Sequence, residues 1–331
     1  MKKIIYIYIT LIVSVIIIYG CKKTPNGFLS AYIHYEQNPM FVPKGRTYLG
    51  PALNADGTSL PFTAKIVHFY DKSTGKIVDD ILQKEYPVLV WTALYNSKTD
   101  TTLALINAKR TTENLPAITV LPSSGQLQTN YGALNLPAGE YQYDLQITNE
   151  TGTKLYPKIG DFILQDTTTF DAVPALGTQY DHLFQVGNES VTGTAAAPTL
   201  TITRDGDSPN TVTIKILDKN GVPFNPKAGE IVRRPNTGVN PNPAYLQTMQ
   251  DYALSYALTD NTMVFTYAFT PFPVTSLGNG YNYYYRIPTQ FFHLDGQPDG
   301  KWSLNLRFPA RFFVTGAYTV TMQMPDVTHT P

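Results

Sequence analysis

Short segments in which large apolar side chains alternate with polar ones are the feature that most restricts the fold of this chain. The clearest lie at residues 60–70 and 212–217, and in the neighbouring pair 252–258 and 263–269. A period of two residues places every second side chain on the same face of a β-strand. Turn sequences separate these segments, as at residues 71–75 (Asp-Lys-Ser-Thr-Gly). The pattern predicts an all-β protein.

Composition and length agree with this prediction. Only 15% of the 331 residues are charged, while the chain holds 23 tyrosines and 25 prolines. Tyrosine, threonine and valine suit half-buried strands, and 43% hydrophobic residues are too many for a disordered chain. Without residues 1–20, about 310 residues remain, enough for two domains. Removal of Lys2 and Lys3 leaves 23 basic against 25 acidic residues, so no nucleic-acid partner is expected.

The N-terminus carries the parts of a secretory signal peptide. Lys2 and Lys3 precede an apolar run over residues 4–19, which ends two residues before Cys21, the single cysteine. Positive charges before a short apolar segment are typical of export signals. The run is shorter than the roughly 20 residues that span a bilayer, and a retained transmembrane helix is the alternative. We expect residues 1–20 to be a signal peptide.

The segment 18–21 (Ile-Tyr-Gly-Cys) resembles the lipobox that bacterial signal peptidases cut before cysteine. A lone cysteine forms no internal disulfide in an oxidising compartment, whereas an acylated cysteine needs no partner. Two or more acyl chains bind a protein stably to a membrane. We therefore expect lipidation at Cys21, with residues 21–30 as a lipidated tether and the membrane as a partner through the lipid anchor.

Two β-domains are expected after the tether. Residues 165–179 lack periodicity and are rich in threonine, aspartate, proline and glycine. This composition is typical of a boundary between domains. The sequence predicts a first β-sandwich domain at residues 31–166, a linker at 167–181 and a second β-sandwich domain at 182–331.

Two pieces of the first half recur in the second. An Asp-Gly-x-Ser turn before an alternating strand begins at Asp56 and again at Asp205, and Gly-x-Tyr recurs at 139–141 and 316–318. A tyrosine of this kind near the head of a strand is typical of the tyrosine corner of Greek-key sandwiches, in which the hydroxyl bonds the preceding backbone. The repeat predicts two tandem immunoglobulin-like β-sandwich domains after the lipoprotein signal peptide.

Five further pieces carry a resemblance to a known family. They are residues 27–30 (Gly-Phe-Leu-Ser), 136–141 (Leu-Pro-Ala-Gly-Glu-Tyr), 284–288 (Tyr-Tyr-Arg-Ile-Pro), the run 302–309 and the closing Gly-x-Tyr at 316–318. Together they resemble a Bacteroidetes outer-membrane lipoprotein family, a domain of unknown function found beside SusC/SusD-type glycan-uptake systems. The resemblance implies an outer-membrane accessory protein with SusC/SusD-type partners. In such lipoproteins an acidic run after the cysteine marks the cell surface. Here Lys22 and Lys23 stand there, so the membrane face stays open.

No motif assigns catalysis, a metal or a cofactor. The five histidines lack metal-ligand spacing. No nucleophile elbow, P-loop or dinucleotide fingerprint occurs in the required context. The acidic turns at 205–207 and 295–299 could offer oxygen atoms to calcium, but they lack the full calcium loop and are interpreted as turns. Carboxylates paired across space, as in a glycoside hydrolase, stay a third possibility. We therefore expect that this protein is not an enzyme.

Residues 281–302 hold the most distinctive composition, with several tyrosines, Arg286 and Trp302. Exposed aromatic rings beside arginine and asparagine are suited to stacking on a sugar ring and bonding its hydroxyls. The alternative is that most of these rings pack in the second sandwich. We assign Tyr284, Arg286 and Trp302 as candidate carbohydrate-binding residues. The predicted function is a non-enzymatic, lipid-anchored binding component of a polysaccharide-uptake system, and the alternative is a scaffolding lipoprotein that contacts other envelope proteins.

Overall fold

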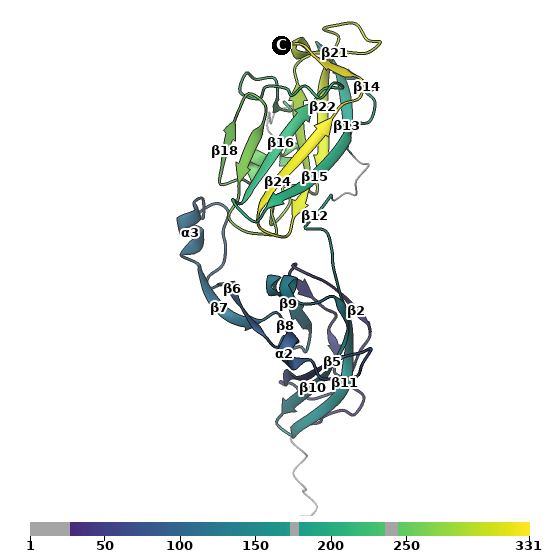
Figure 1. The fold of residues 1–331 in the computed structure, drawn as a ribbon, viewed down its shortest axis with the longest axis vertical. Coiled ribbons are helices and arrows are strands. Elements are labelled where there is room, and N and C mark those ends of the chain that lie inside the picture. The colour runs from purple at the N-terminus through teal and green to yellow at the C-terminus, as the bar shows by residue number, and fades with distance from the viewer. Residues whose placement is uncertain (1–26, 173–178, 236–243) are drawn as a thin grey trace, which may run out of the picture. The chain divides into compact units, whose positions relative to one another are not determined.

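The computed structural model describes residues 27–172, 179–235 and 244–331. The predicted signal peptide, Cys21 and residues 21–26 of the tether lie outside these ranges. The described chain is all-β, as predicted, with 47% of residues in strands and 8% in helices. Two compact units are present, one formed by residues up to Tyr86 with Asn114–Asp166, the other by Pro87–Glu113 with Thr167–Pro331 (Figure 1). Among the described helices, none is long and apolar enough to cross a membrane.

The first unit is a sandwich of two sheets. The larger sheet consists, in spatial order, of β2 (Met40–Pro43), β11 (Gly152–Gln165), β10 (Gly139–Asn149) and β5 (Thr63–Asp71). The smaller sheet consists of β3 (Tyr48–Leu49), β9 (Leu127–Thr129) and β8 (Ile118–Val120). Two-stranded pairs are formed by β1 (His34–Tyr35) with β4 (Leu53–Asn54) and by β6 (Glu85–Trp91) with β7 (Arg110–Pro116). Its short helical turns are α2 (Asp79–Leu82) and η1 (Tyr131–Asn135), whereas α3 (Leu103–Asn107) and the adjoining parts of β6 and β7 belong to the second unit.

Aromatic rings from the larger sheet fill the core of the first unit. Phe69 packs edge-on against Tyr143 and Phe162, with ring centroids 6.1 Å apart in both pairs. Ile118 and Leu127 of the smaller sheet belong to the same buried cluster. Each large side chain that is fully buried contributes about 1.5–3 kcal/mol to folding. The alternating pattern of the sequence therefore has its physical basis in this shared core.

The second unit is a sandwich of two five-stranded sheets (Figure 1). One sheet consists, in spatial order, of β14 (Asn188–Thr194), β13 (Tyr180–Gln185), β22 (Trp302–Pro309), β20 (Asn282–Ile287) and β17 (Val232–Arg233). The other consists of β15 (Thr199–Gly206), β24 (Ala317–Gln323), β16 (Thr211–Leu217), β19 (Met263–Thr266) and β18 (Ser255–Leu258). The remaining elements are β12 (Phe170–Asp171) with β23 (Arg311–Phe312), β21 (Phe292–Leu294) with β25 (Val327–His329), and the turns η2 (Ala244–Leu246), η3 (Met249–Asp251) and η4 (Thr289–Phe291).

The core of the second unit joins the inner faces of its two sheets. Tyr285 stacks on Phe308 with centroids 6.1 Å apart. Ile214 and Val320 of the opposite sheet are fully buried in the same cluster. The two sheets therefore close over one continuous apolar core, and the outer face of each is left for other contacts.

The unit boundaries differ from the predicted ones at two places. Pro87–Glu113 lies within the predicted first domain but belongs to the second unit, where the Trp91 and Phe269 rings have centroids 5.0 Å apart. The predicted linker 167–181 contains β12, which pairs with β23, and the start of β13 at Tyr180. A two-residue strand carries no visible alternation, and a ring contact across almost 180 positions leaves no local pattern. For these physical reasons the sequence did not indicate either feature.

Both predicted tyrosine corners are present. The hydroxyl of Tyr141 donates to the carbonyl oxygen of Pro137 at 3.0 Å, and the hydroxyl of Tyr318 donates to that of Val314 at 2.7 Å. The other half of the repeat is not equivalent, because β5 runs antiparallel to β10 whereas β16 runs parallel to β24. Alternation specifies a strand but not the direction of its neighbour. The repeat therefore holds for the corners alone.

Candidate functional site

The candidate site lies on the outer face of the sheet that contains β20. Successive side chains of a strand point to opposite faces. Tyr283 and Tyr285 enter the buried cluster of the second unit, so Tyr284 and Arg286 face the other way. Across β22 and β13, Arg307 stands opposite both Tyr284 and Tyr180. A row of alternating aromatic and cationic groups therefore crosses three strands on this outer face.

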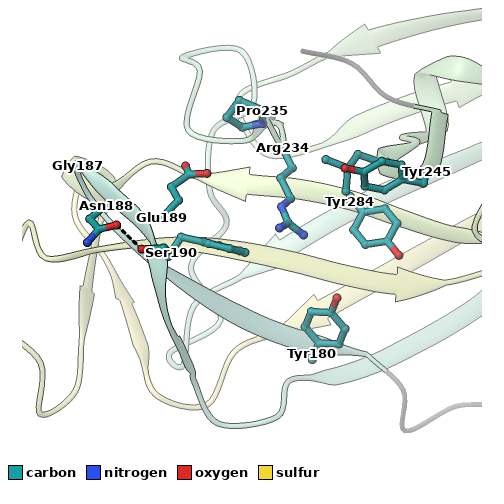
Figure 2. A pocket seen from close by; sticks show the side chains of 11 residues that line it. Tyr180, Gly187, Asn188, Glu189, Ser190, Arg234, Pro235, Tyr245 and Tyr284 are labelled. Atoms are coloured by element: carbon teal, nitrogen blue, oxygen red, sulfur yellow. Dashed lines mark hydrogen bonds between the residues drawn. The ribbon is translucent and has the colours of Figure 1, made fainter. Parts of the chain in front are cut away.

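An open pocket of about 790 Å³ lies over this face. Aromatic rings, one carboxylate and polar groups of the β13–β14 hairpin line it, together with residues around the end of β17: Tyr180, Phe184, Gly187, Asn188, Glu189, Ser190, Arg234, Pro235, Tyr245, Leu246 and Tyr284 (Figure 2). Its volume is within the range of pockets that hold small molecules. Apolar walls with a few convergent polar groups are what such ligands require.

Two arginines pack on rings at the pocket. The guanidinium carbon of Arg234 lies 4.5 Å from the ring centroid of Phe184, and that of Arg307 lies 4.1 Å from the ring centroid of Tyr180. Contacts of this length between a guanidinium and a ring face are attractive. The contact fixes the orientation of both partners, and within the described residues it leaves the edge of the Arg234 guanidinium available for hydrogen bonds.

Arg286 holds Glu189 in place. Its Nη1 lies 2.8 Å from Oε1 of Glu189, and its Nε donates to Oδ1 of Asn305 at 2.7 Å. Only 12% of the Arg286 side chain is exposed, against 29% for Glu189. The predicted binding residue Arg286 is therefore a positioning group, and the pocket-lining carboxylate that it orients is Glu189.

Arg234 has a different environment. Within the described residues, its guanidinium has no carboxylate or carbonyl partner, and its contact is the ring of Phe184. Burial and the nearby charge of Arg286 lower the pKa of Arg234. Figure 2 shows the guanidinium pointing into the pocket, between Glu189 and Tyr284. Within the described residues, the pocket therefore presents a cation with no hydrogen-bond acceptor, although the charge of Glu189 is near enough to act on it.

The three predicted binding residues are not brought together. Tyr284 lines the pocket, although only 3% of it is exposed, and its hydroxyl accepts a hydrogen bond from Asn279. Burial is the main cause that raises its pKa. Trp302 is 8% exposed, belongs to the core and donates from Nε1 to Gln297 at 2.9 Å. Trp302 is not a pocket residue, because it shares the inward face of β22 with Leu304.

Sequence reasoning missed most of the pocket. Tyr180 and Phe184 alternate within β13, a signal that was available but fell at the edge of the predicted linker. Glu189 comes from the β13–β14 hairpin and Arg234 from the end of β17, opposite edges of one sheet, and both line the same pocket. No local pattern indicates this proximity. Tyr245, which is 50% exposed, is the most accessible aromatic residue of the lining.

The acidic turns considered for calcium have other partners. Asp295 pairs with Lys219 at 2.7 Å, and Asp299 pairs with His293 at 2.6 Å. In the other turn, Asp207 pairs with Arg204 at 2.7 Å. Carboxylates engaged by basic side chains are poor calcium ligands unless those pairs break. Within the described ranges, no group of three or more histidine, cysteine, aspartate or glutamate side chains is placed to hold a metal ion.

Comparison with known proteins identifies no relative by sequence. No family model matches the chain, and no curated protein matches it. Among solved structures, it is similar to the N-terminal four Ig domains of Dscam1 isoform 4.4, with 11% identity and a TM-score of 0.18. That alignment covers 89% of this chain and 53% of the other, so the chain spans about half the length of the structure it matches. The architecture above follows from the sheets and cores themselves.

Proposed function

We propose that this protein is a non-enzymatic, lipid-anchored component of the cell envelope that binds a glycan in the pocket of its second unit. The pocket over the β13–β14 hairpin carries this proposal. It combines the rings of Tyr180, Phe184 and Tyr245 with the polar groups of Asn188 and Glu189. Rings supply flat apolar surface for the faces of a sugar, and amide and carboxylate oxygens accept hydrogen bonds from its hydroxyls.

Binding is favoured over hydrolysis by the charges at the pocket. Glu189 is the one carboxylate among the described residues that line it. Hydrolysis of a glycosidic bond by the usual route needs two carboxyl groups, about 5–10 Å apart on either side of the bond. A glycoside hydrolase is therefore the weakest of the alternatives. If the purified protein releases reducing ends from a glycan that it binds, the protein is a glycoside hydrolase instead.

The envelope location is proposed from the sequence. The segment around Cys21 supports a lipid anchor, and the resemblance to Bacteroidetes lipoproteins supports the outer membrane and a SusC/SusD-type uptake complex as partners. In such a complex, a sandwich on a short tether would hold a captured glycan close to the membrane. The face of the outer membrane is a separate question, and protease treatment of intact cells answers it.

A glycan array probed with the full-length protein in a non-glycosidic detergent tests the proposal. We expect binding to at least one polysaccharide, and loss of that binding in Tyr245→Ala, whose ring is half exposed at the pocket. Tyr256→Ala is the matched control, because Tyr256 is 55% exposed on β18 of the opposite sheet. Absence of binding to every polysaccharide, or equal loss in both variants, would contradict the proposal.

The scaffolding alternative rests on a different surface. In the segment Pro87–Glu113, Leu94 is 92% exposed, and Leu103 and Leu105 of α3 are 50% and 48% exposed. Large apolar side chains that are exposed within one short segment are candidates for a protein contact. If replacement of these leucines by serine releases an envelope partner while glycan binding is unchanged, the scaffolding role exists. If nothing is released, it fails.

A further inference from the structure

The charges around the pocket do not balance. Glu189 is the one carboxylate among the described lining residues, whereas three guanidinium groups lie in or beside the pocket: Arg234 lines it, Arg286 binds Glu189 and Arg307 packs on the lining ring of Tyr180. Burial and the charge of Arg234 lower the pKa of His182 on the same face, so this imidazole is neutral near pH 7. The described charged groups at the pocket therefore carry a net positive charge of about two at neutral pH.

Among the three arginines, the positions of two are explained by contacts within the protein. Arg286 is bound to Glu189 and Asn305. Arg307 stacks on Tyr180, and a hydrogen bond from it to the Tyr284 hydroxyl lowers the pKa of that tyrosine. Arg234 has neither a carboxylate nor a hydroxyl as partner in the described chain, although it is partly withdrawn from water over Phe184.

The position of Arg234 costs free energy in the free protein, and binding of an anion would recover that free energy. Loss of hydration costs free energy that a stack on Phe184 only partly recovers. A carboxylate or sulfate recovers it through two parallel hydrogen bonds, which is the geometry that a guanidinium presents. Neutral sugar hydroxyls form weaker bonds with the same group. The unpaired edge of Arg234 is thus suited to an anion.

Building on the proposed glycan-binding function, we propose that the ligand is an acidic saccharide whose carboxylate or sulfate is held by Arg234. The ring of the acidic sugar lies among Tyr180, Tyr245 and Phe184, and Glu189, held by Arg286, accepts hydrogen bonds from its hydroxyls. Arg307, on the row between Tyr180 and Tyr284, adds attraction for negative charge without direct contact. The site therefore selects by charge as well as by shape.

Matched pairs of polysaccharides test this inference. The first pair is polygalacturonate and its fully methyl-esterified form, which share a backbone and differ in the carboxylate. The second pair is a sulfated galactan and its desulfated form. Binding of the full-length protein, in a non-glycosidic detergent, to each immobilised polymer is measured by interferometry. The pair that shows the larger difference identifies the carboxylate or the sulfate as the anion.

The decisive variants are Arg234→Gln, Arg234→Lys and the control Lys215→Gln. Lys215 lies on β16 in the other sheet, so the control removes a positive charge remote from the pocket. We expect Arg234→Gln to weaken binding of the charged polymer by about tenfold to a hundredfold, down to the level of its neutral partner. Arg234→Lys should recover only part of the affinity, because lysine lacks the planar fork. Lys215→Gln should bind like the wild type.

The possible failures separate the two proposals. If wild-type protein binds the charged and neutral polymers equally, or if Arg234→Gln binds the charged polymer as wild type does, the acidic-saccharide inference is wrong and glycan binding stands. If no polymer of either kind, and no glycan on the array, is bound, both proposals are wrong. Arg234→Gln should keep a melting temperature close to that of the wild type, since among the described residues Arg234 loses only its contact with the ring of Phe184.

Discussion

The hydroxyl of Tyr318 donates a hydrogen bond of 2.7 Å to the carbonyl oxygen of Val314, four residues earlier. Tyr141 makes the same bond to Pro137 in the other unit. Tyr318 is fully buried, and in the second unit the backbone of Gly316 also bonds the hydroxyl of Tyr267, as donor and as acceptor. The corner therefore satisfies several backbone groups at the point where the chain enters β24.

Removal of one hydroxyl should destabilise the protein measurably. We expect Tyr318→Phe to lower the free energy of unfolding by about 1–3 kcal/mol, because the buried carbonyl of Val314 loses its donor. Urea unfolding followed by fluorescence measures the change. Tyr256→Phe, at an exposed tyrosine, is the control and should leave stability within about 0.5 kcal/mol of the wild type. Equal stability of Tyr318→Phe and wild type would show that the corner bond contributes nothing.

A glycine of the first unit is predicted to tolerate no side chain. A Cβ built on Gly160 in β11 lies 2.2 Å from the ring of Tyr143, which is fully buried. Gly160→Ala should therefore destabilise the protein by about 1–3 kcal/mol or more through overpacking. Gly193→Ala is the matched control, because its Cβ meets Leu183 at an ordinary 3.5 Å. Thermal unfolding compares the two, and a Gly160→Ala melting temperature equal to that of Gly193→Ala would refute the clash.

The buried carboxyl group of Asp181 should make the stability of the folded protein fall as the pH rises. Its carboxyl group is fully buried in the second unit, and neither oxygen has a hydrogen-bond partner in the described chain. Burial, and to a lesser extent the charge of Asp326, raise the pKa of Asp181 well above its usual 3.8. A carboxyl group whose pKa is raised on folding binds its proton more tightly in the folded state. Ionisation of Asp181 therefore does not destabilise the folded protein below the pKa that this group has in the unfolded chain. The destabilisation grows as the pH rises from that value toward the pKa in the folded protein.

The variant Asp181→Asn removes this titration. We expect it to be more stable than the wild type at pH 7, by about 1–3 kcal/mol, with an advantage that shrinks as pH falls and disappears near pH 3.5. Calorimetry between pH 3 and 8 measures the difference. Asp207→Asn, whose side chain is 92% exposed, should show no such trend. An advantage of Asp181→Asn that is constant with pH would argue against the raised pKa.

The lipid anchor is tested at Cys21. We expect Cys21→Ser to abolish incorporation of labelled palmitate and to release the protein from the membrane fraction, because no other cysteine exists to be acylated. Mass spectrometry of the mature N-terminus is the second measurement. A wild-type protein that begins at Met1 and stays in the membrane without label would establish the retained transmembrane helix instead.

The alternation of apolar and polar residues predicts where strands lie, but it does not predict which strands pair with one another. The hairpin expected at 252–258 and 263–269 is present as β18 and β19, with Leu258 opposite Met263. Both tyrosine corners were expected as well. Such features depend on residues that are close in sequence, where side-chain period and turn chemistry act directly.

The site depends on relationships that no local pattern carries. Trp302 was assigned to a sugar site because it is aromatic, yet Leu304 and Leu306 at the same parity already indicated the core face. Arg234 and Glu189 line one pocket although β14 and β17 are opposite edges of a five-stranded sheet. Strand order is set by the packing of the whole unit, so it could not be derived from either segment alone.

The placement of Pro87–Glu113 in the second unit has a consequence for biosynthesis. At about 5–20 residues per second, the ribosome takes roughly 8–30 s to pass from Glu113 to Phe269. Throughout that interval the ring of Trp91 lacks Phe269, its partner in the second unit. The nascent chain therefore carries the apolar ring of Trp91 before its partner exists, and this ring stays open to other apolar contacts until Phe269 has been made.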